Sequence, residues 1–225
     1  MSNFTTWRSL VDGEEIGAIP DSGLDHRYIA DDIDSSDGDT IDSWSPSEGD
    51  LTLNAVGGPI YRSNGIGGNP SVEFDGVDDL FQSSGDSIPQ PTHIFVVAKF
   101  NDSSGIQNIF DGESADGRQI IQANSGGYRI FAGSDTVGGG SVDTDPHIYT
   151  ASFDAENSYL RVDGDQILSG DPGNDGLSML TLGASNSESD HFEGEISEWL
   201  VYSDDKGGEE DDIEELLAQE YGISL

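Results

Sequence analysis

The chain has 225 residues, with 45 Asp and Glu against 8 Lys and Arg, no cysteine and a formal net charge of −37. The absence of cysteine excludes disulfides and thiolate metal sites, and nucleic acid is a poor partner because no basic patch can displace counterions from phosphates. The acid excess is typical of a protein adapted to high salt, where a Debye length of ~3 Å screens mutual repulsion. An acidic face for a basic partner is the alternative.

Residues 1–24 differ in pattern from the rest of the chain. Phe4, Trp7, Leu10 and Val11 fall near helical spacing, and the stretch GEEIGAIPDSG that follows is linker-like. We expect either an arm that attaches the domain to something larger or a strand or turn at the domain's edge. The N-terminus has no apolar run of signal-peptide length, and no stretch could span a bilayer.

From residue 25 onward, short apolar runs alternate with polar turns, which is typical of a single all-β domain over residues 25–225. The runs rich in β-branched and aromatic residues predict strands. They are Tyr28–Ile33, Ile41–Trp44, Ile60–Arg62, Val72–Phe74, Leu80–Gln82, Thr92–Phe100, Ile106–Asp111, Gln119–Ala123, Tyr128–Ala132, His147–Phe153, Tyr159–Val162, Gln166–Leu168 and Leu180–Gly183. Thr92–Phe100 is nearly continuous in apolar residues, so we expect it at the centre of a sheet.

Two connections carry clear turn signals. Asp163-Gly164 predicts a two-residue hairpin turn, because both positions tolerate positive φ. The glycine-rich NGIGGNP lacks the lysine and the following helix of a phosphate loop, so it is predicted to be a turn as well.

The C-terminal stretch predicts a long, buried strand followed by a helix. Glu195–Tyr202 is rich in β-branched and aromatic residues, and Glu209–Tyr221 places Ile213, Leu216 and Leu217 on helical spacing. We therefore predict an all-β fold, a two-sheet antiparallel jelly-roll sandwich with one C-terminal α-helix. The aromatic residues expected in its core are Trp44, Phe74, Phe81, Phe95, Phe153 and Trp199.

Several stretches in order resemble a concanavalin A-like lectin/glucanase domain of the laminin-G-like type. They are DSWSPSEGDLTLNA, PIYRSNGIGGNPSVEFDGVDDLF, HIYTASFDAENSYLRVDGDQI, LTLGAS and FEGEISEWLVYS, with the terminal helix ending in EYGI. The resemblance covers roughly residues 24–225. It implies two antiparallel sheets, one curved and one flatter. Domains of this type occur in secreted proteins, adhesins and virus tail proteins; most bind glycans or proteins, and some are glycosidases.

Glu193, Glu195 and Glu198 are the candidate catalytic residues. Glycosidases of the resembling family carry acids along one inner strand, and two carboxyls ~5 Å apart on one face could act as nucleophile and acid/base. In a regular strand Glu193 and Glu195 share a face and Glu198 points the other way. The central aspartate usual in the family is missing here. We therefore predict a non-enzymatic protein, with a glycoside hydrolase as the alternative.

Three acidic loops could hold a calcium ion, which needs several hard oxygen ligands on a bent loop. Asp75, Asp78 and Asp79 in DGVDD are the preferred set, because this turn is the most family-like of the three. The alternative is that these aspartates only form a turn. The other two clusters are Asp34, Asp37 and Asp39 in DSSDGD, and Asp111, Glu113 and Asp116 in DGESADG.

Exposed tyrosines would stack on sugar rings, and Tyr61, Tyr128 and Tyr159 are the candidate ligand-binding residues, with Tyr202 as a further one. The four histidines stand apart in sequence, with no pair at metal-ligand spacing. His93 and His147 begin strands and are predicted to be hydrogen-bonded sheet residues.

Together these patterns favour a virion surface protein of a halophilic archaeal virus, made in the host cytoplasm without a signal peptide. As a capsid decoration, turret or tail spike it would bind host surface glycan or surface-layer glycoprotein. It would form a homo-oligomer in the particle, whose several copies supply avidity, and would join other virion proteins through residues 1–24. No nucleic acid and no membrane insertion are expected. The alternatives are a glycoside hydrolase of the same fold and a purely structural virion protein.

Overall fold

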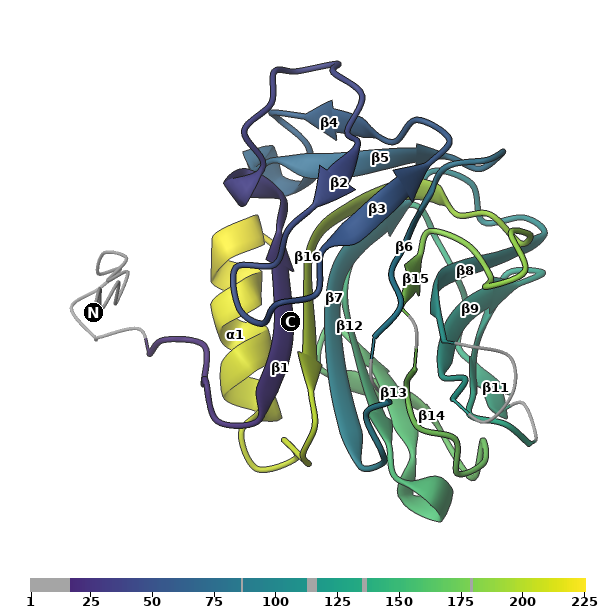
Figure 1. The fold of residues 1–225 in the computed structure, drawn as a ribbon. Helices are drawn as coiled ribbons and strands as arrows, with labels where there is room; N and C mark the ends of the chain where they lie inside the picture. The colour runs from purple at the N-terminus through teal and green to yellow at the C-terminus, as the bar shows by residue number, and fades with distance from the viewer. Residues whose placement is uncertain (1–16, 86, 113–116, 135–136, 179) are drawn as a thin grey trace.

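The computed structural model describes residues 17–85, 87–112, 117–134, 137–178 and 180–225. Over these residues the chain forms two antiparallel sheets of eight strands each, with one α-helix, α1 (Glu210–Tyr221). The sheets face each other, and α1 lies against the first sheet on the side away from the second (Figure 1). The predicted fold is confirmed: a mostly β, two-sheet antiparallel sandwich with one C-terminal helix.

The first sheet has the strand order β14-β13-β12-β7-β16-β5-β4, and β1 pairs with β16. β7 lies between β12 and β16, which confirms its predicted central place. The strands of this sheet are β1 (Leu24–Ile29), β4 (Ile60–Arg62), β5 (Ser71–Asp75), β7 (Thr92–Phe100), β12 (Pro146–Phe153), β13 (Tyr159–Val162), β14 (Asp165–Ser169) and β16 (Glu193–Tyr202).

The second sheet has the order β11-β10-β9-β8-β15-β6-β3-β2. Its strands are β2 (Ser43–Trp44), β3 (Leu53–Val56), β6 (Leu80–Gln82), β8 (Ile106–Asp111), β9 (Ile120–Asn124), β10 (Gly127–Phe131), β11 (Val137–Gly139) and β15 (Thr181–Leu182). Single 3₁₀ turns occur at Ala30–Asp32, Ile66–Gly68 and Ala155–Asn157, the last of these before β13.

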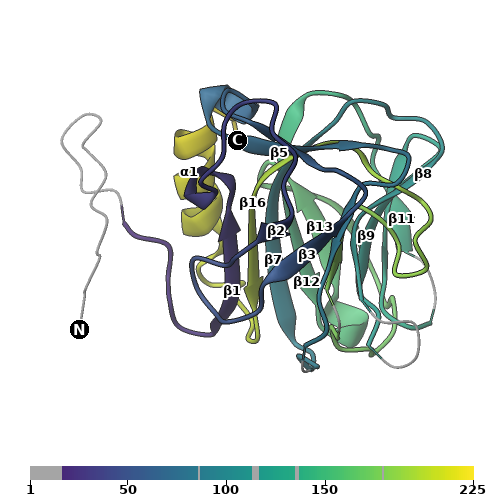
Figure 2. The ribbon, with the colours of Figure 1, turned by 45° about the horizontal axis from the view of Figure 1, so that its top comes forward.

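β16 is the strand around which the first sheet is built (Figure 2). It pairs with β7 along one side, and on the other side with β5 over its first half and β1 over its second. The pairing with β7 shifts between Ile196 and Glu198, so Ser197 is an extra residue in a β-bulge. The expectation that Glu198 faces away from Glu195 is therefore wrong, because the bulge resets the alternation.

The inner faces of the two sheets enclose the main hydrophobic core. All six aromatic residues predicted to be in the core are fully buried. Five of them lie between the sheets, where Trp199 stacks near Tyr28 with ring centroids 5.6 Å apart. Phe95 instead lies on the outer face of the first sheet, in the cluster beneath α1.

α1 covers the outer face of the first sheet with an apolar stripe. Ile213 and Leu217 pack on Phe95 and Leu200, and these residues belong to a second hydrophobic cluster. Leu216 is half-buried and outside this cluster, so the predicted stripe is rotated towards the side that buries Glu214. The helix ends at Gly222, whose φ of 66° lies in the left-handed region that glycine adopts readily.

The segment that precedes β1 already contacts the sandwich. Ile19 packs against the cluster beneath α1. The hydroxyl of Tyr202 donates to the carbonyl of Pro20 at 2.9 Å, and the Ser203 N–H donates to the carbonyl of Gly23 at 2.9 Å. Contacts with the domain thus begin before residue 24, while residues 1–16 of the predicted arm lie outside the described residues. Among the described helices, none is long and apolar enough to cross a membrane.

Candidate functional site

The three candidate catalytic glutamates lie on the outer side of β16, but two of them are held by basic side chains. Glu195 accepts a hydrogen bond from the Ser71 hydroxyl at 2.7 Å and lies 3.6 Å from Lys99 Nζ. Glu198 is 2% exposed, and burial raises the pKa of its carboxyl although Arg27 and Tyr221 both donate to it. These contacts tie β16 to β7, β1 and α1.

Glu193 differs from the other two because it is exposed at the start of β16. Its direct neighbour on β5 is Asp75, the first of the three candidate metal ligands. The predicted calcium loop and the beginning of β16 therefore meet at one end of the sandwich, which we call the rim.

Asp75, Asp78 and Asp79 are brought together as predicted, with one carboxylate oxygen from each within 4.8 Å of the others. Asp79 is buried and accepts backbone N–H bonds from Gly58 at 2.6 Å and Asp75 at 3.0 Å. Its burial raises the pKa of its carboxyl. Asp75 and Asp78 are exposed, so the group offers hard oxygen ligands on a bent loop and could hold a metal ion.

A hollow of about 480 Å³ lies at the same rim, where β5 and β7 end and β8 and β16 begin. We call it the rim hollow. Ile106 at its wall is 44% exposed, and Val77 in the adjoining aspartate turn is 69% exposed, so two of the four exposed large hydrophobic side chains in the described chain lie here. The lining residues are Gly76, Asp102, Ser104, Ile106, Gln107, Asp190, His191 and Glu193.

Polar groups of the rim hollow are partly ordered and partly without partners. Gln107 is fixed, because its amide donates to the carbonyls of Asp102 and Ser104 and accepts the N–H of Glu193. The Nδ1 atom of His191 is buried and has no hydrogen-bond partner among the described residues. The hollow therefore combines an apolar side chain with carboxylates and an imidazole in its lining.

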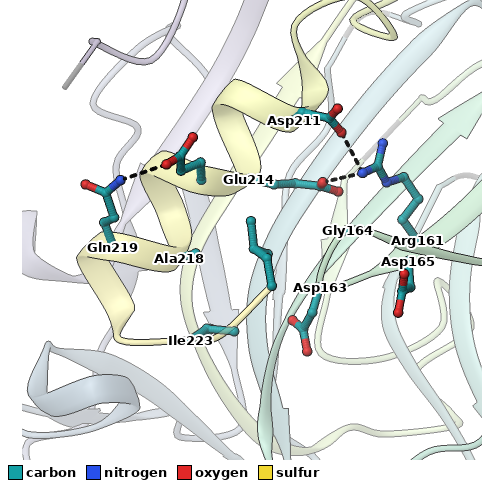
Figure 3. A pocket seen from close by; sticks show the side chains of 11 residues that line it. Arg161, Asp163, Gly164, Asp165, Asp211, Glu214, Ala218, Gln219 and Ile223 are labelled. Carbon is teal, nitrogen blue, oxygen red and sulfur yellow. Dashed lines mark hydrogen bonds and ion pairs between the residues drawn. The ribbon is translucent and has the colours of Figure 1, made fainter. Parts of the chain in front are cut away.

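A second hollow, of about 570 Å³, lies between α1 and the turn that joins β13 to β14 (Figure 3). Arg161 on β13 points towards the helix, where it forms ion pairs with Glu210, with Asp211 at 2.7 Å and with Glu214 at 2.9 Å. Burial raises the pKa of the Glu214 carboxyl. This network attaches the helix to the sheet, so we assign it a structural role.

The candidate sugar-stacking tyrosines are placed differently from the expectation. Tyr61 is 6% exposed and Tyr128 is 2% exposed, and both belong to the main core, so neither offers a ring face to a ligand. Tyr202 is fully buried beneath α1. Tyr159 is half-buried, and its hydroxyl donates to Glu210 at 2.6 Å. Sequence alternation does not separate a buried tyrosine from an exposed one at these positions.

His93 and His147 make hydrogen bonds in the sheet, as predicted. The buried His93 accepts the Lys206 N–H at Nδ1, and its Nε2 lies 3.3 Å from a carboxylate oxygen of Glu210. His147 lies between Asp163, 2.5 Å from its Nδ1, and Asp143, 2.8 Å from its Nε2. Burial lowers the pKa of His147, but the two aspartates raise it further, to about 9.

The other two acidic clusters serve turns and an ion pair. Asp37 and Asp39 accept the backbone N–H groups of Ser63 and Ser36, while Asp34 belongs to the same exposed loop. Asp111 is fully buried, and its carboxylate accepts hydrogen bonds from Nε and Nη2 of Arg118, the shortest from each at 3.0 Å. Glu113 and Asp116, the remaining candidates of that cluster, lie outside the described residues.

Comparisons with known proteins define the fold class. No protein-family model matches the sequence, and no curated protein matches it. Solved structures do match. Trypanosoma rangeli sialidase in complex with the inhibitor DANA has a TM-score of 0.65 at 13% identity, over 98% of this chain and 36% of that one. The binding domain of botulinum neurotoxin serotype C1 has a TM-score of 0.65 at 11% identity, over 88% of this chain and 52% of that one.

Domain 4 of AbnA, a GH43 extracellular arabinanase from Geobacillus stearothermophilus, was solved in complex with arabinotriose. It has a TM-score of 0.60 at 18% identity, over 80% of this chain and 91% of that one. The chain spans little more than a third of the sialidase's length. At these identities the matches establish a shared two-sheet sandwich fold and nothing finer.

Proposed function

We propose that this sandwich is a non-enzymatic binding module that holds a glycan in the rim hollow. The observation that carries the proposal is the composition of that hollow: exposed Ile106 lies beside the carboxylates of Asp102, Asp190 and Glu193 and the imidazole of His191. A sugar presents apolar C–H faces and hydroxyl donors together, and sites for such ligands combine apolar walls with a few fixed polar groups. Carboxylates accept strong hydrogen bonds from hydroxyls.

Calcium at Asp75, Asp78 and Asp79 is part of the proposal. The three carboxylates adjoin the hollow through Gly76, which lines it, and through the Asp75–Glu193 pairing. A bound calcium ion would neutralise part of the negative charge at the rim and fix the turn that carries Val77. Glycan affinity is therefore expected to fall when calcium is removed by a chelator.

Two of the similar structures support a binding role. One is described as a binding domain, and another holds arabinotriose. The contacts of Glu195 with Lys99 and of Glu198 with Arg27 support the non-enzymatic part, because both carboxylates are engaged by basic side chains of the sheet.

The finer part of the proposal places the protein on the surface of a virion of a halophilic archaeal virus, facing a host glycan or surface-layer glycoprotein. It rests on the charge of −37 and the resemblance found in the sequence. In this setting several copies would convert weak individual contacts into avidity, and residues 1–24 would attach the copies to other virion proteins.

The test uses the full chain, because the contacts with Pro20 and Gly23 belong to the sandwich. Binding to a panel of host surface glycans is measured at about 1 M NaCl, where long-range repulsion is screened, with calcium and with chelator. We expect Glu193→Gln and His191→Ala to weaken binding about tenfold. Glu215→Gln is the control, because it removes one negative charge from an exposed position on α1, and it is expected to have no effect on glycan binding.

Three results would contradict the proposal. If Glu215→Gln weakened glycan binding as much as Glu193→Gln does, net charge and not the rim hollow would govern binding. Cleavage of a bound glycan that Glu193→Gln abolishes would favour the glycoside hydrolase. A full chain that binds no glycan but joins virus particles would favour the purely structural virion protein.

A further inference from the structure

Almost every basic side chain in the described part of the chain is neutralised by a carboxylate. The sequence holds 8 Lys and Arg, of which Arg8 lies outside the described residues, and six of the remaining seven form ion pairs. Those six pairs join Arg27 to Glu198, Arg62 to Glu73, Lys99 to Glu195, Arg118 to Asp111, Arg161 to Glu210, and Lys206 to Asp204.

Arg129 is the exception. It is exposed on β10 and makes no ion pair or hydrogen bond within the described residues, although the chain carries 45 acidic groups. Its neighbours in the register are Gln122 on β9 and Gly138 on β11. Because Tyr128 and Ile130 on either side of it point into the core, Arg129 projects from the outer face of the second sheet.

Amide side chains lie beside Arg129 on the outer face of the second sheet. Gln122 donates to Asn108 at 2.8 Å and accepts from Asn124 at 3.4 Å, so a row of amides follows the outer face. Phe131, two residues along β10, is half-buried and has the Arg118 guanidinium 5.5 Å from its ring centroid. The Arg118 charge is taken up by Asp111, so Arg129 presents the unneutralised positive charge on this face.

This face adjoins the rim hollow. Ile106, which lines the hollow, is the direct cross-strand neighbour of Asn124, and Asn124 lies two residues from Gln122 on β9. With strands ~4.8 Å apart and ~3.4 Å per residue, Ile106 and Arg129 are separated by about 12 Å along one surface. An oligosaccharide seated in the hollow can extend over the amides to reach the guanidinium.

We propose that the ligand is an acidic glycan, whose carboxylate or sulfate group binds Arg129 while a neighbouring sugar occupies the rim hollow. This inference rests on the proposed function and specifies its ligand class. The guanidinium fork matches both anionic groups with paired hydrogen bonds. The net charge of −37 repels such a ligand at long range. Because the Debye length shortens to ~3 Å at 1 M salt, we expect affinity for the acidic glycan to rise between about 0.1 M and about 1 M salt.

The experiment compares galacturonic acid oligomers with galactose oligomers of the same length, which differ by one carboxylate per sugar, and with sulfated galactose oligomers. Binding of each to the full chain is measured at about 1 M NaCl. We expect the acidic oligomers to bind about tenfold more tightly than the neutral one, and the comparison between them identifies carboxylate or sulfate. Arg129→Gln is expected to remove this preference and leave neutral binding unchanged.

Two variants sharpen the result. Arg62→Gln removes one positive charge from an edge strand of the first sheet and is expected to keep the preference. Arg129→Lys keeps the charge but loses the fork, so it is expected to retain part of the preference. Equal binding of neutral and acidic oligomers by the unaltered protein, or an unchanged preference in Arg129→Gln, would overturn the inference while glycan binding stands. Failure of every oligomer and of the host glycan panel would overturn both proposals.

Discussion

His147 is a residue whose protonation couples to folding. It bridges Asp143, in the loop before β12, and Asp163, in the turn after β13, and its pKa in the folded protein is raised to about 9. A pKa raised above the unfolded value of 6.5 means that the folded state binds the proton more tightly. The stabilisation is therefore complete below about pH 6.5 and disappears as the pH rises through about 9.

We expect the free energy of unfolding to fall by about 2 kcal/mol between pH 6.5 and 9, allowing for partial solvent screening of this pair of carboxylates. His147→Gln should be less stable than the parent at pH 6 and should show little pH dependence in this window. Chemical denaturation at a series of pH values measures both. His191→Gln, which alters a histidine at the rim, should keep the parent's slope; a flat parent profile would contradict the prediction.

The burial of some single residues could not be predicted from the sequence. The helical spacing of α1 correctly predicts Ile213 and Leu217 in the interface, but it selects Leu216 over Glu214. Glu214 is buried because Arg161, more than fifty positions earlier in the chain, supplies a positive charge at that point. A hydrophobic pattern cannot anticipate a buried carboxylate whose partner comes from another element.

At the scale of the element, the bulge in β16 decides which face each glutamate takes. Deleting Ser197 removes the extra residue and leaves Ile196 facing inward and Glu198 facing outward. We therefore expect the deletion variant to fold, with a loss of about 1–3 kcal/mol in the free energy of unfolding. Thermal unfolding followed by near-UV circular dichroism measures the effect, since Trp199 lies two positions away.

Deletion of Val96 is the matched comparison. It removes one buried residue from β7, where the pairing with β12 is regular, so every residue on one side of the deletion moves to the wrong face. This variant should not fold. If the Ser197 deletion unfolds the protein just as completely, the bulge is not a removable insertion and the assignment of faces in β16 needs revision.

Strands with strong side-chain patterns were the predictable ones. β4, β6, β7, β8 and β13 begin and end where the sequence predicts, because apolar runs in them are bounded by polar or glycine residues. β3 and β11 were not predicted. In β3 only Leu53 is buried, and β11 consists of one valine and two glycines, so both depend on backbone pairing with a neighbouring strand.

The candidate site also has one part that the sequence predicts and one part that it does not. Asp75, Asp78 and Asp79 are close in sequence, so a turn signal is enough to bring them together. The rim hollow draws its residues from positions 76, 102–107 and 190–193, and none of these segments has a distinctive pattern by itself. Their proximity follows from strand order, which requires the structure.

For the whole molecule, the dominant quantity is net charge. At a formal charge of −37, repulsion among carboxylates opposes the compact state, and it extends over ~30 Å in 0.01 M salt but only ~3 Å in 1 M salt. We expect the melting temperature to rise markedly from dilute buffer to molar salt. Calorimetry in NaCl and in KCl at equal ionic strength measures this, and both salts should act alike if screening is the cause.

Ion pairs act in the opposite direction, because salt weakens exposed pairs such as that of Arg62 with Glu73. With 8 Lys and Arg against 45 acidic groups, repulsion is expected to dominate. A melting temperature that stays constant or falls with salt would show that the acid excess is not an adaptation to salinity.

The position of β16 also constrains the order in which the molecule can form during translation. This strand follows every other strand described here, yet it fills the space between β7 on one side and β5 and β1 on the other. Until residues 193–202 leave the ribosome, the first sheet is divided into two parts with open edges. The sandwich must therefore form late and in one cooperative step, and the nascent chain needs its high negative charge, or a chaperone, to avoid aggregation through those edges.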